Sequence, residues 1–302
     1  MSASSHLKRI SALLLLIAIQ TAVTLANAQT SHSLMLWLDG GATSFFDNIE
    51  ESKYAIGGGG GAGFGYELQH KHFLLDIGVG FEYGATSTFM HPYTVDIAGL
   101  VDSEGDTYTG HFTFDQRRDN SNLGYVNIPL LMGGRFNHFY FLVGAKLGVN
   151  LIYNANVQSN VTVKGTYDKY LGLWENMPNH NFGTTELATE SPIAFNSIDL
   201  KGSLEMGYRF DIKKPNEWSP TSPVSFRIGG FIDYGILNAN SGINNYGYAT
   251  VPENGDVGQI SMNHVFVSNL AEEKLINNFF VGVKFTILFR MPSPKDCRCD
   301  FY

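Results

Sequence analysis

The feature that most constrains this chain is a strict alternation of apolar and polar residues over long segments. In residues 198–211, every second residue from Ile198 onward is apolar or glycine, and the residues between them are charged or small. A period of two puts the two sets of side chains on opposite faces of a β-strand. Similar alternation marks seven further segments, at residues 34–45, 58–68, 73–85, 125–136, 139–153, 224–236 and 279–290. The sequence therefore predicts eight long amphipathic strands.

The polar faces of these strands mix charged residues with many glycines. The chain has 33 glycines and only 16% charged residues. No apolar stretch after residue 28 reaches the roughly 20 residues that a membrane-spanning helix needs. Small residues suit a crowded interior, where facing strands leave little room. We therefore expect an all-β fold, an eight-stranded antiparallel up-and-down transmembrane β-barrel, in preference to a secreted β-sandwich.

The charges on the polar faces are balanced, with seven acidic and seven basic residues. These lumen ion-pair candidates are Asp39, Glu67, Asp76, Glu82, Asp199, Glu205, Asp233, Arg135, Lys146, Lys201, Arg209, Arg227, Lys284 and Arg290. Because buried ions are costly unless they are paired, this balance predicts a lumen closed by ion pairs and not a pore lined by one sign of charge. Glu205 and Arg209 stand about 13 Å apart along one strand, so we expect each to pair with an ion on a neighbouring strand.

The segments that connect the predicted strands alternate in length. Short or moderate connectors lie at 69–72, 137–138 and 212–223, and long ones lie at 46–57, 86–123, 154–194 and 238–276. Outer-membrane barrels join their strands by short periplasmic turns and longer extracellular loops. We therefore expect long extracellular loops, with both ends of the barrel in the periplasm.

The N-terminal segment has the three parts of a secretory signal. Lys8 and Arg9 precede an apolar run at residues 10–24, and Ala26-Asn27-Ala28 is a small-x-small cleavage site. We predict a signal peptide at 1–28, an outer-membrane β-barrel at 29–290 and a periplasmic tail at 291–302. This organisation predicts signal-peptide-dependent export, followed by insertion into the bacterial outer membrane, where the surrounding partner is outer-membrane lipid.

One hairpin carries a family resemblance. The run from Gly124 to Leu131, with the sequence GYVNIPLL, and the run from Phe139 to Gly148, with the sequence FYFLVGAKLG, flank the turn at 137–138. This hairpin resembles that of small bacterial outer-membrane β-barrel proteins of the PorT-like and OmpA-barrel-like group. The resemblance implies an eight-stranded barrel inserted by the barrel-assembly machinery, and no shared catalytic residues. The chain continues past Phe289 by a tail too short for a C-terminal peptidoglycan-binding domain.

Candidate chemistry elsewhere in the sequence is sparse. The net charge of −8 argues against a nucleic-acid partner. The glycines at 57–61 lack the Gly-Lys-Ser/Thr of a nucleotide loop, and Cys297 and Cys299 have no neighbouring ligands to complete a metal site. Four histidines fall in predicted external loops without a spacing that ties them to a nucleophile, namely His91, His111, His180 and His264. We expect no enzymatic activity, no cofactor and no metal.

The predicted external loops are the better candidates for function. The 154–194 loop carries an apolar and aromatic cluster, formed by Tyr167, Tyr170, Leu171, Leu173 and Trp174. Such a cluster is costly to expose, so it either packs over the barrel mouth or contacts a surface protein or polysaccharide. We expect a structural or surface-interaction role through these loops. A small diffusion channel is the alternative, and a barrel-type outer-membrane enzyme is a more distant one.

Overall fold

The computed structural model of the protein describes residues 30–50, 52–167, 169, 172–175, 182–191, 195–212, 223–240 and 247–291. The predicted signal peptide at 1–28 lies outside these residues, as does the predicted tail apart from Met291. The described residues form an all-β structure, and no helix among them is long and apolar enough to cross a membrane.

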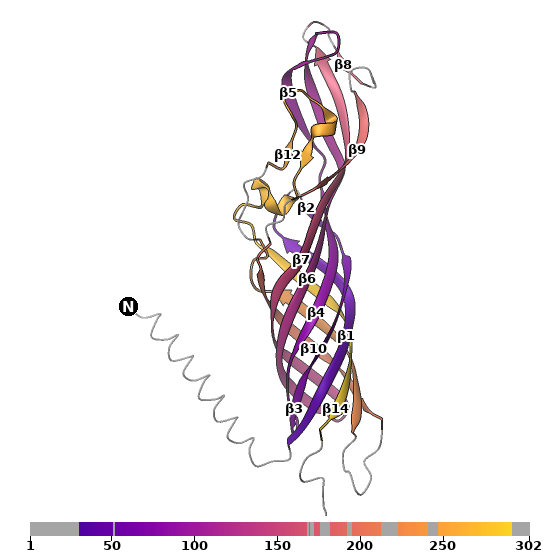
Figure 1. Cartoon of the computed structure of the whole chain (residues 1–302), viewed down its shortest axis with the longest axis vertical. Coiled ribbons are helices and arrows are strands. Elements are labelled where there is room, and N and C mark those ends of the chain that lie inside the picture. The colour runs from indigo at the N-terminus through magenta and orange to yellow at the C-terminus, as the bar shows by residue number, and fades with distance from the viewer. Residues whose placement is uncertain are drawn as a thin grey trace, which may run out of the picture.

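Eight antiparallel strands are hydrogen-bonded in a ring, in the order β1-β3-β4-β6-β7-β10-β11-β14 and back to β1 (Figure 1). The strands are β1 (Thr30–Asp47), β3 (Gly57–His70), β4 (Phe73–Met90), β6 (Thr107–Phe136), β7 (Phe139–Tyr167), β10 (Ile198–Asp211), β11 (Val224–Gly235) and β14 (Ile276–Arg290). This confirms the prediction of eight antiparallel strands in an all-β fold. The tight turns between β3 and β4 and between β6 and β7 also lie where the connector lengths predict them.

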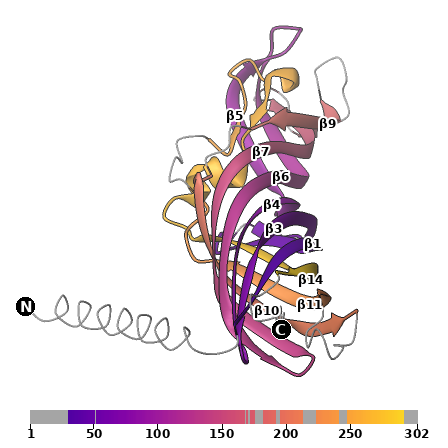
Figure 2. The same cartoon turned by 60° about the horizontal axis from the view of Figure 1, so that its bottom comes forward.

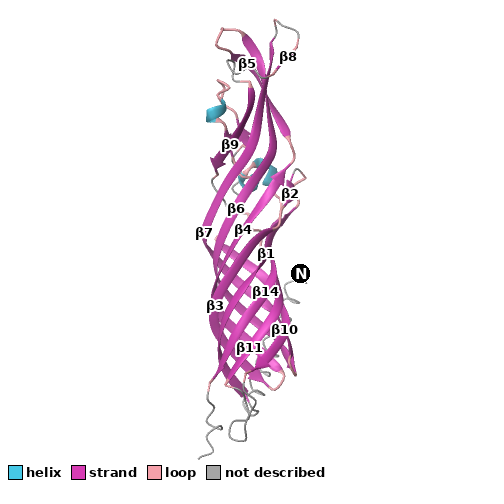
Figure 3. Cartoon of the chain, turned by 90° about the vertical axis from the view of Figure 1, so that its right-hand side faces the viewer, coloured by secondary structure: helices cyan, strands magenta, loops and turns pink. Residues whose placement is uncertain are grey.

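The strands are staggered around the ring. A path through paired residues that starts at Thr43 on β1 visits every strand and returns to β1 at Ser33, ten residues earlier. With the usual strand spacing, this stagger tilts the strands by about 40° from the ring axis. Figure 3 shows the resulting crossing of front and back strands. A ring of eight strands leaves an interior just wide enough for side chains.

Glycines make room for the indole ring of Trp37 in this interior. The indole of Trp37 lies against Gly63 and Gly78, where an added Cβ would come within 2.2 Å and 2.7 Å of it. Residues larger than glycine at these two positions would collide with the indole. The glycines on the polar faces therefore make the interior packing possible, as their position in the sequence predicts.

Two strands of the ring continue well beyond it. β6 and β7 have 30 and 29 residues, and their far parts join β5 (Tyr93–Val101), β8 (Leu173–Trp174) and β9 (Gly183–Glu190). We call residues 107–122 and 154–167, together with β5, β8 and β9, the projecting sheet; Figure 2 shows it as an extension of the ring. The prediction of a loop at 154–194 is wrong over most of its described residues, because they pair as strands. At 86–123, the alternation of apolar and polar residues at 108–114 predicts that the connector continues the strands, and their pairing confirms this. A short strand, β2 (Ser52–Tyr54), also pairs with β4.

Residues 247–275, which we call the mouth segment, cover one face of the projecting sheet and the adjoining end of the ring. The segment contains β12 (Ala249–Thr250), η3 (Val257–Gln259), β13 (Ser261–Met262), η4 (Val265–Val267) and η5 (Asn269–Ala271). Ile260 and Met262 pack into a core with the projecting sheet. Val265 and Phe266 pack with Phe45 from β1 and other side chains from the end of the ring. The mouth segment therefore closes this end of the ring with apolar side chains.

Candidate functional site

The ring is apolar outside and charged inside. Leucine, isoleucine, valine, phenylalanine and methionine side chains are exposed on the outside of all eight strands, and we call them the belt. The belt includes Leu34, Leu36, Leu38, Phe64, Ile77, Val79, Phe81, Ile128, Leu130, Met132, Phe141, Val143, Leu147, Val149, Leu204, Met206, Ile228, Ile232, Val283 and Phe285. The buried side chains between them are mostly charged or hydroxylic. This distribution is the reverse of that in a water-soluble domain.

A cluster of two arginines and two carboxylates occupies one level of the interior. The Arg227 guanidinium donates to Glu67 at 3.0 Å and to Asp76 at 2.6 Å, and Arg209 donates to the other oxygen of Glu67 at 2.9 Å. The Arg227 guanidinium also lies 5.0 Å from the ring centre of Tyr140. All these groups are buried, so each charge depends on its partners for compensation.

Further ion pairs fill the remaining levels. Lys284 donates to Glu205 at 2.7 Å, and the Tyr140 hydroxyl donates to the second oxygen of the same carboxylate at 2.8 Å. The other buried pairs are Lys146 with Asp233 and Lys201 with Glu82, and Asp199 lies 3.9 Å from Lys201. The interior therefore holds a stack of paired ions along its length.

The expectation that these ions pair with neighbouring strands is wrong. The neighbours of β10 in the ring are β7 and β11, but Glu205 pairs with β14, Arg209 with β3 and Lys201 with β4. Long side chains that point inward from opposite walls meet near the axis of a narrow ring, whereas inward side chains on adjacent strands run side by side. These ion pairs therefore connect strands that lie two to four places apart in the ring.

Three of the predicted interior ions are not part of these buried ion pairs. Arg135 is half-buried at the rim and pairs at 3.3 Å with Asp211, a residue that was not among the candidates. Asp211 was detectable, because it shares the polar parity of residues 198–211. Within the described residues, Oδ1 of Asp39 and Nε and Nη1 of Arg290 are buried without a hydrogen-bond partner.

An ion pair that sequence reasoning missed holds the mouth segment. Arg117 and Asp119 on β6 are fully buried and form a bidentate pair, with Nε to Oδ1 at 2.9 Å and Nη2 to Oδ2 at 3.2 Å. Arg117 also donates to the carbonyl of Tyr248, and Asp119 accepts the Val265 amide at 2.7 Å. Burial lowers the pKa of Arg117, but the Asp119 carboxylate more than compensates and holds that pKa above its ordinary value.

A β-bulge aims Arg117 inward. The register between β6 and β7 shifts between Asp115 and Arg118, and Gln116 has a φ of 50°, in the left-handed region. The extra residue reverses which face the next side chain occupies. The sequence signal was the break in alternation at this point, where three long polar residues follow Asp115 in succession.

His264, one of the four candidate histidines, lies beside this ion pair. Burial lowers its pKa to about 4, which makes the imidazole neutral. Its Nδ1 accepts the Phe266 amide at 3.2 Å, so Nε2 carries the proton and donates to the Ser121 hydroxyl at 2.8 Å. A general base for Ser121 would need the opposite tautomer. The hydrogen bond between His264 and Ser121 therefore holds the mouth segment against β6.

The other candidate histidines are dispersed. His91 is exposed, and His180 lies outside the described residues. His111 on β6 lies between Asp96 on β5 at 2.7 Å and Thr166 on β7 at 2.9 Å. This row has the order of a catalytic triad, but it lies across the open surface of the projecting sheet and lines none of the described hollows.

The predicted aromatic cluster of residues 167–174 is split. Tyr167 is buried with Tyr108 and Phe182, and its hydroxyl donates to Asp102 at 2.8 Å. Leu173 and Trp174 are exposed on β8. Tyr170 and Leu171 lie outside the described residues. Packing thus accounts for Tyr167, whereas Leu173 and Trp174 lie at the surface.

The two faces of the projecting sheet differ sharply. One face packs against the mouth segment through buried apolar side chains. The other face, which we call the polar face, carries amides, hydroxyls and charges. Its residues include Thr94, His111, Thr113, Arg118, Asn120, Asn122, Asn154, Asn156, Gln158, Asn160, Thr162, Lys164, Thr184, Glu186 and Glu190. Hydroxyl contacts join Thr94 to Thr113 at 3.0 Å and Thr162 to Thr184 at 2.8 Å, so side-chain bonds order this face laterally.

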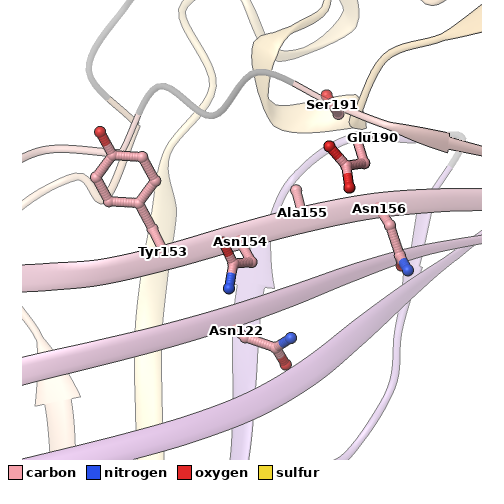
Figure 4. Close-up of a pocket in the computed structure, with 7 residues that line it drawn as sticks. All are labelled: Asn122, Tyr153, Asn154, Ala155, Asn156, Glu190 and Ser191. Carbon is pink, nitrogen blue, oxygen red and sulfur yellow. The ribbon is translucent and has the colours of Figure 1, made fainter.

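Two hollows lie along β7 on this side of the molecule. The lower one, of about 490 Å³, is lined by Asn122, Asn154, Asn156, Tyr153 and Glu190 among others (Figure 4). The upper one, of about 400 Å³, is lined by Phe89, Arg118, Gln158, Asn160 and Glu186 among others. Each hollow combines amides, a carboxylate and an exposed aromatic ring.

No protein-family model matches this chain. No curated protein matches it either. Among solved structures, the chain is similar to Ail, the attachment invasion locus protein of Yersinia pestis, solved in complex with the heparin analogue sucrose octasulfate. The two chains are 9% identical over 85% of this chain and 99% of that one, with a TM-score of 0.23. A TM-score this low gives the likeness no weight for function. The resemblance to PorT-like and OmpA-barrel-like proteins remains a prediction from the hairpin at 124–148.

Proposed function

We propose that this protein is an integral outer-membrane β-barrel with a surface-interaction role, exerted by the projecting sheet. The observation that supports this most directly is the belt of exposed apolar side chains around a charged, paired interior. In water such a surface would promote aggregation. In a bilayer the apolar belt contacts lipid, and the charged side chains lie in the lumen.

The dimensions of the belt fit a bilayer. On β10 it runs from Ile198 to Phe210, which covers about 30 Å along the ring axis at the usual rise and tilt, close to the thickness of a hydrocarbon core. On β7 the exposed apolar residues end at Tyr153, and polar residues begin at Asn154. We place the membrane surface at this change, with the projecting sheet outside the cell.

A closed interior favours the surface role over a diffusion channel. The ion pairs join non-adjacent strands through the interior, and the mouth segment covers one end with Val265, Phe266 and Ala271. Water and solutes would have to separate paired ions to pass, at a considerable cost in free energy. The surface role also needs no catalytic group, and we propose no enzymatic activity. Export by the signal peptide and insertion by the barrel-assembly machinery belong to the same proposal.

Membrane insertion is testable with a matched pair of substitutions. Val143→Arg puts a charge in the middle of the belt, and Gln158→Arg puts the same charge on the polar face. We expect Val143→Arg to destabilise the lipid-embedded protein by about 2–4 kcal/mol and to reduce its recovery in the outer-membrane fraction, because a lipid-facing charge is costly. Gln158→Arg should do neither. Recovery of the wild type as a soluble periplasmic protein would refute the proposal.

A further inference from the structure

The lower hollow lies at a gap in the strand pairing of β7. On the side away from β6, β10 pairs with β7 only as far as Val149, and the pairing with β9 begins at Asn156. Within the described residues, this leaves a short stretch of β7 edge between two strand ends. Figure 4 shows Asn154 and Asn156 pointing to one side of β7 and the Tyr153 ring to the other. The gap therefore has amides on one side of β7, an aromatic ring on the other and a stretch of strand edge between them.

The shape of the gap excludes a peptide strand as its ligand. A chain added alongside β7 would run into the start of β10 at Ile198 and the end of β9 at Glu190. The gap is only six residues long, from 150 to 155. Its two end residues are already engaged, because the Asn150 amide donates to the Ser197 carbonyl and the Ser191 amide donates to the Ala155 carbonyl. A compact polar group fits this space, whereas an extended chain does not.

The charged groups in the two hollows indicate which class of ligand they can bind. Among the described residues that line the lower hollow, Glu190 is the charged one and none is a cation. In the upper hollow Arg118 is balanced by Glu186, and its guanidinium is already engaged with Ser87 at 3.0 Å and over the Phe89 ring at 5.6 Å. A phosphate, sulfate or carboxylate ligand would meet a carboxylate in each hollow, and it would find no cation in the lower one. The hollows therefore favour an uncharged ligand rich in hydroxyls.

The remaining groups suit sugars. Planar amides both donate to and accept from vicinal hydroxyls, and a carboxylate accepts from two of them at once. An exposed aromatic ring offers a flat apolar face. Tyr153 is 53% exposed and Asn154 has no hydrogen bond to another side chain among the described residues, so both groups are available. The two hollows are separated by about 13 Å along β7, from Asn154 to Gln158, which suits a short linear oligomer.

Building on the surface-interaction role proposed above, we propose that the two hollows along β7 bind a neutral polysaccharide presented from outside the cell. The saccharide chain lies along the polar face, with one sugar residue in the gap at the edge of β7, between Asn154 on one side and the Tyr153 ring on the other, and a later one beside Gln158. A glycolipid of the surrounding membrane is disfavoured as the source, because the upper hollow lies beyond the end of the belt.

The test uses the full-length protein, purified in detergent and applied to an array of neutral, sulfated and sialylated oligosaccharides of one to six residues. We expect binding to neutral members of three residues or more, at least tenfold tighter than to the corresponding monosaccharides. Tyr153→Ala and Asn154→Ala should each weaken this binding at least tenfold. Tyr234→Ala is the matched control, because Tyr234 is similarly exposed on the outside of the ring but lines neither hollow; its binding should be unchanged.

Several results would overturn the inference. They are absence of binding to every neutral member, tighter binding of the sulfated or sialylated members, and equal binding by wild type and both hollow variants. Binding only when a neutral galactolipid is present in nanodiscs would refute an external polysaccharide. Heat-modifiable migration of each variant on gels shows whether the ring is folded, so failure of glycan binding by a folded, surface-exposed protein refutes this inference and leaves the proposed function standing.

Discussion

Arg227 on β11 and Glu67 on β3 are joined by a hydrogen bond of 3.0 Å, and neither side chain is reached by solvent. The two strands are separated by β14 and β1 in the ring, so this contact spans the interior. It links opposite walls through a buried pair that also includes Asp76. The stability of the ring should therefore depend on single interior residues.

Replacing Arg227 by methionine should destabilise the folded ring strongly. The substitution leaves Asp76 without its arginine and Glu67 with Arg209 alone, so a buried carboxylate is uncompensated. We expect a loss of about 3–5 kcal/mol in urea unfolding followed by tryptophan fluorescence. Lys164→Met breaks an exposed pair with Glu175 and is the control, at about 0–1 kcal/mol. Equal stability of the two variants would indicate a hydrated interior.

The protein should not conduct ions in planar bilayers, and loosening the mouth segment should not change that. Arg117→Ala removes the buried partner of Asp119 and the contacts to Tyr248. We expect faster proteolysis within residues 247–275, but no ohmic steps, because the ion pairs inside the ring still block the path. Steady conductance in the wild type would contradict the closed interior. Conductance in the variant alone would make the mouth segment the gate.

Packing of the mouth segment should weaken as the pH falls. The pKa of His264 is about 4 in the folded protein and 6.5 as its ordinary value, so the unfolded segment binds more protons between these values. Stability is therefore fully present above about pH 6.5 and is lost progressively toward pH 4, by up to about 3 kcal/mol. Hydrogen exchange at residues 264–271 measures this. His264→Gln should remove the part of the fall in stability that lies between pH 6.5 and 5.

Glycine and a β-branched residue at position 116, in the bulge on β6, should affect stability differently. Gln116 has a φ of 50°, which glycine adopts freely and valine does not. We expect Gln116→Gly to be neutral or mildly stabilising, and Gln116→Val to cost about 1–2 kcal/mol. Gln158→Val, on β7 opposite the bulge and without a positive φ, controls for the loss of the amide. If Gln116→Val is tolerated as well as its control, the left-handed conformation does not aim Arg117.

The sequence predicts the eight strands and their inward faces well, but not the partners of the interior ions. Alternation in residues 198–211 shows which face Glu205 occupies, because the face of a side chain depends only on its position within its own strand. Its pairing with Lys284 depends on the registers of β10 with β11 and of β11 with β14, which no single strand records. Arg117 was missed for a related reason, since a bulge breaks the pattern from which faces are predicted.

The projecting sheet shows a different limit. Residues 154–167 alternate as regularly as the ring strands, with Val157, Val161 and Val163 on the covered face and amides or threonines on the other. Their position in a long connector favoured a loop. The period of two indicates a strand there, whereas connector length favours a loop. The two hollows depend on where β9 leaves β7, a property of tertiary pairing that the sequence does not show.

Because β6 and β7 run without interruption from the turn at 137–138 to the tip of the molecule, they form a beam that is fixed at its base. Their hydrogen bonds lie across the strand direction. A pull on β7 near Tyr167 is therefore borne as shear by many of these bonds at once, and not by one bond after another as in unzipping. Whatever the projecting sheet holds, a tensile load from it passes directly into the wall of the ring.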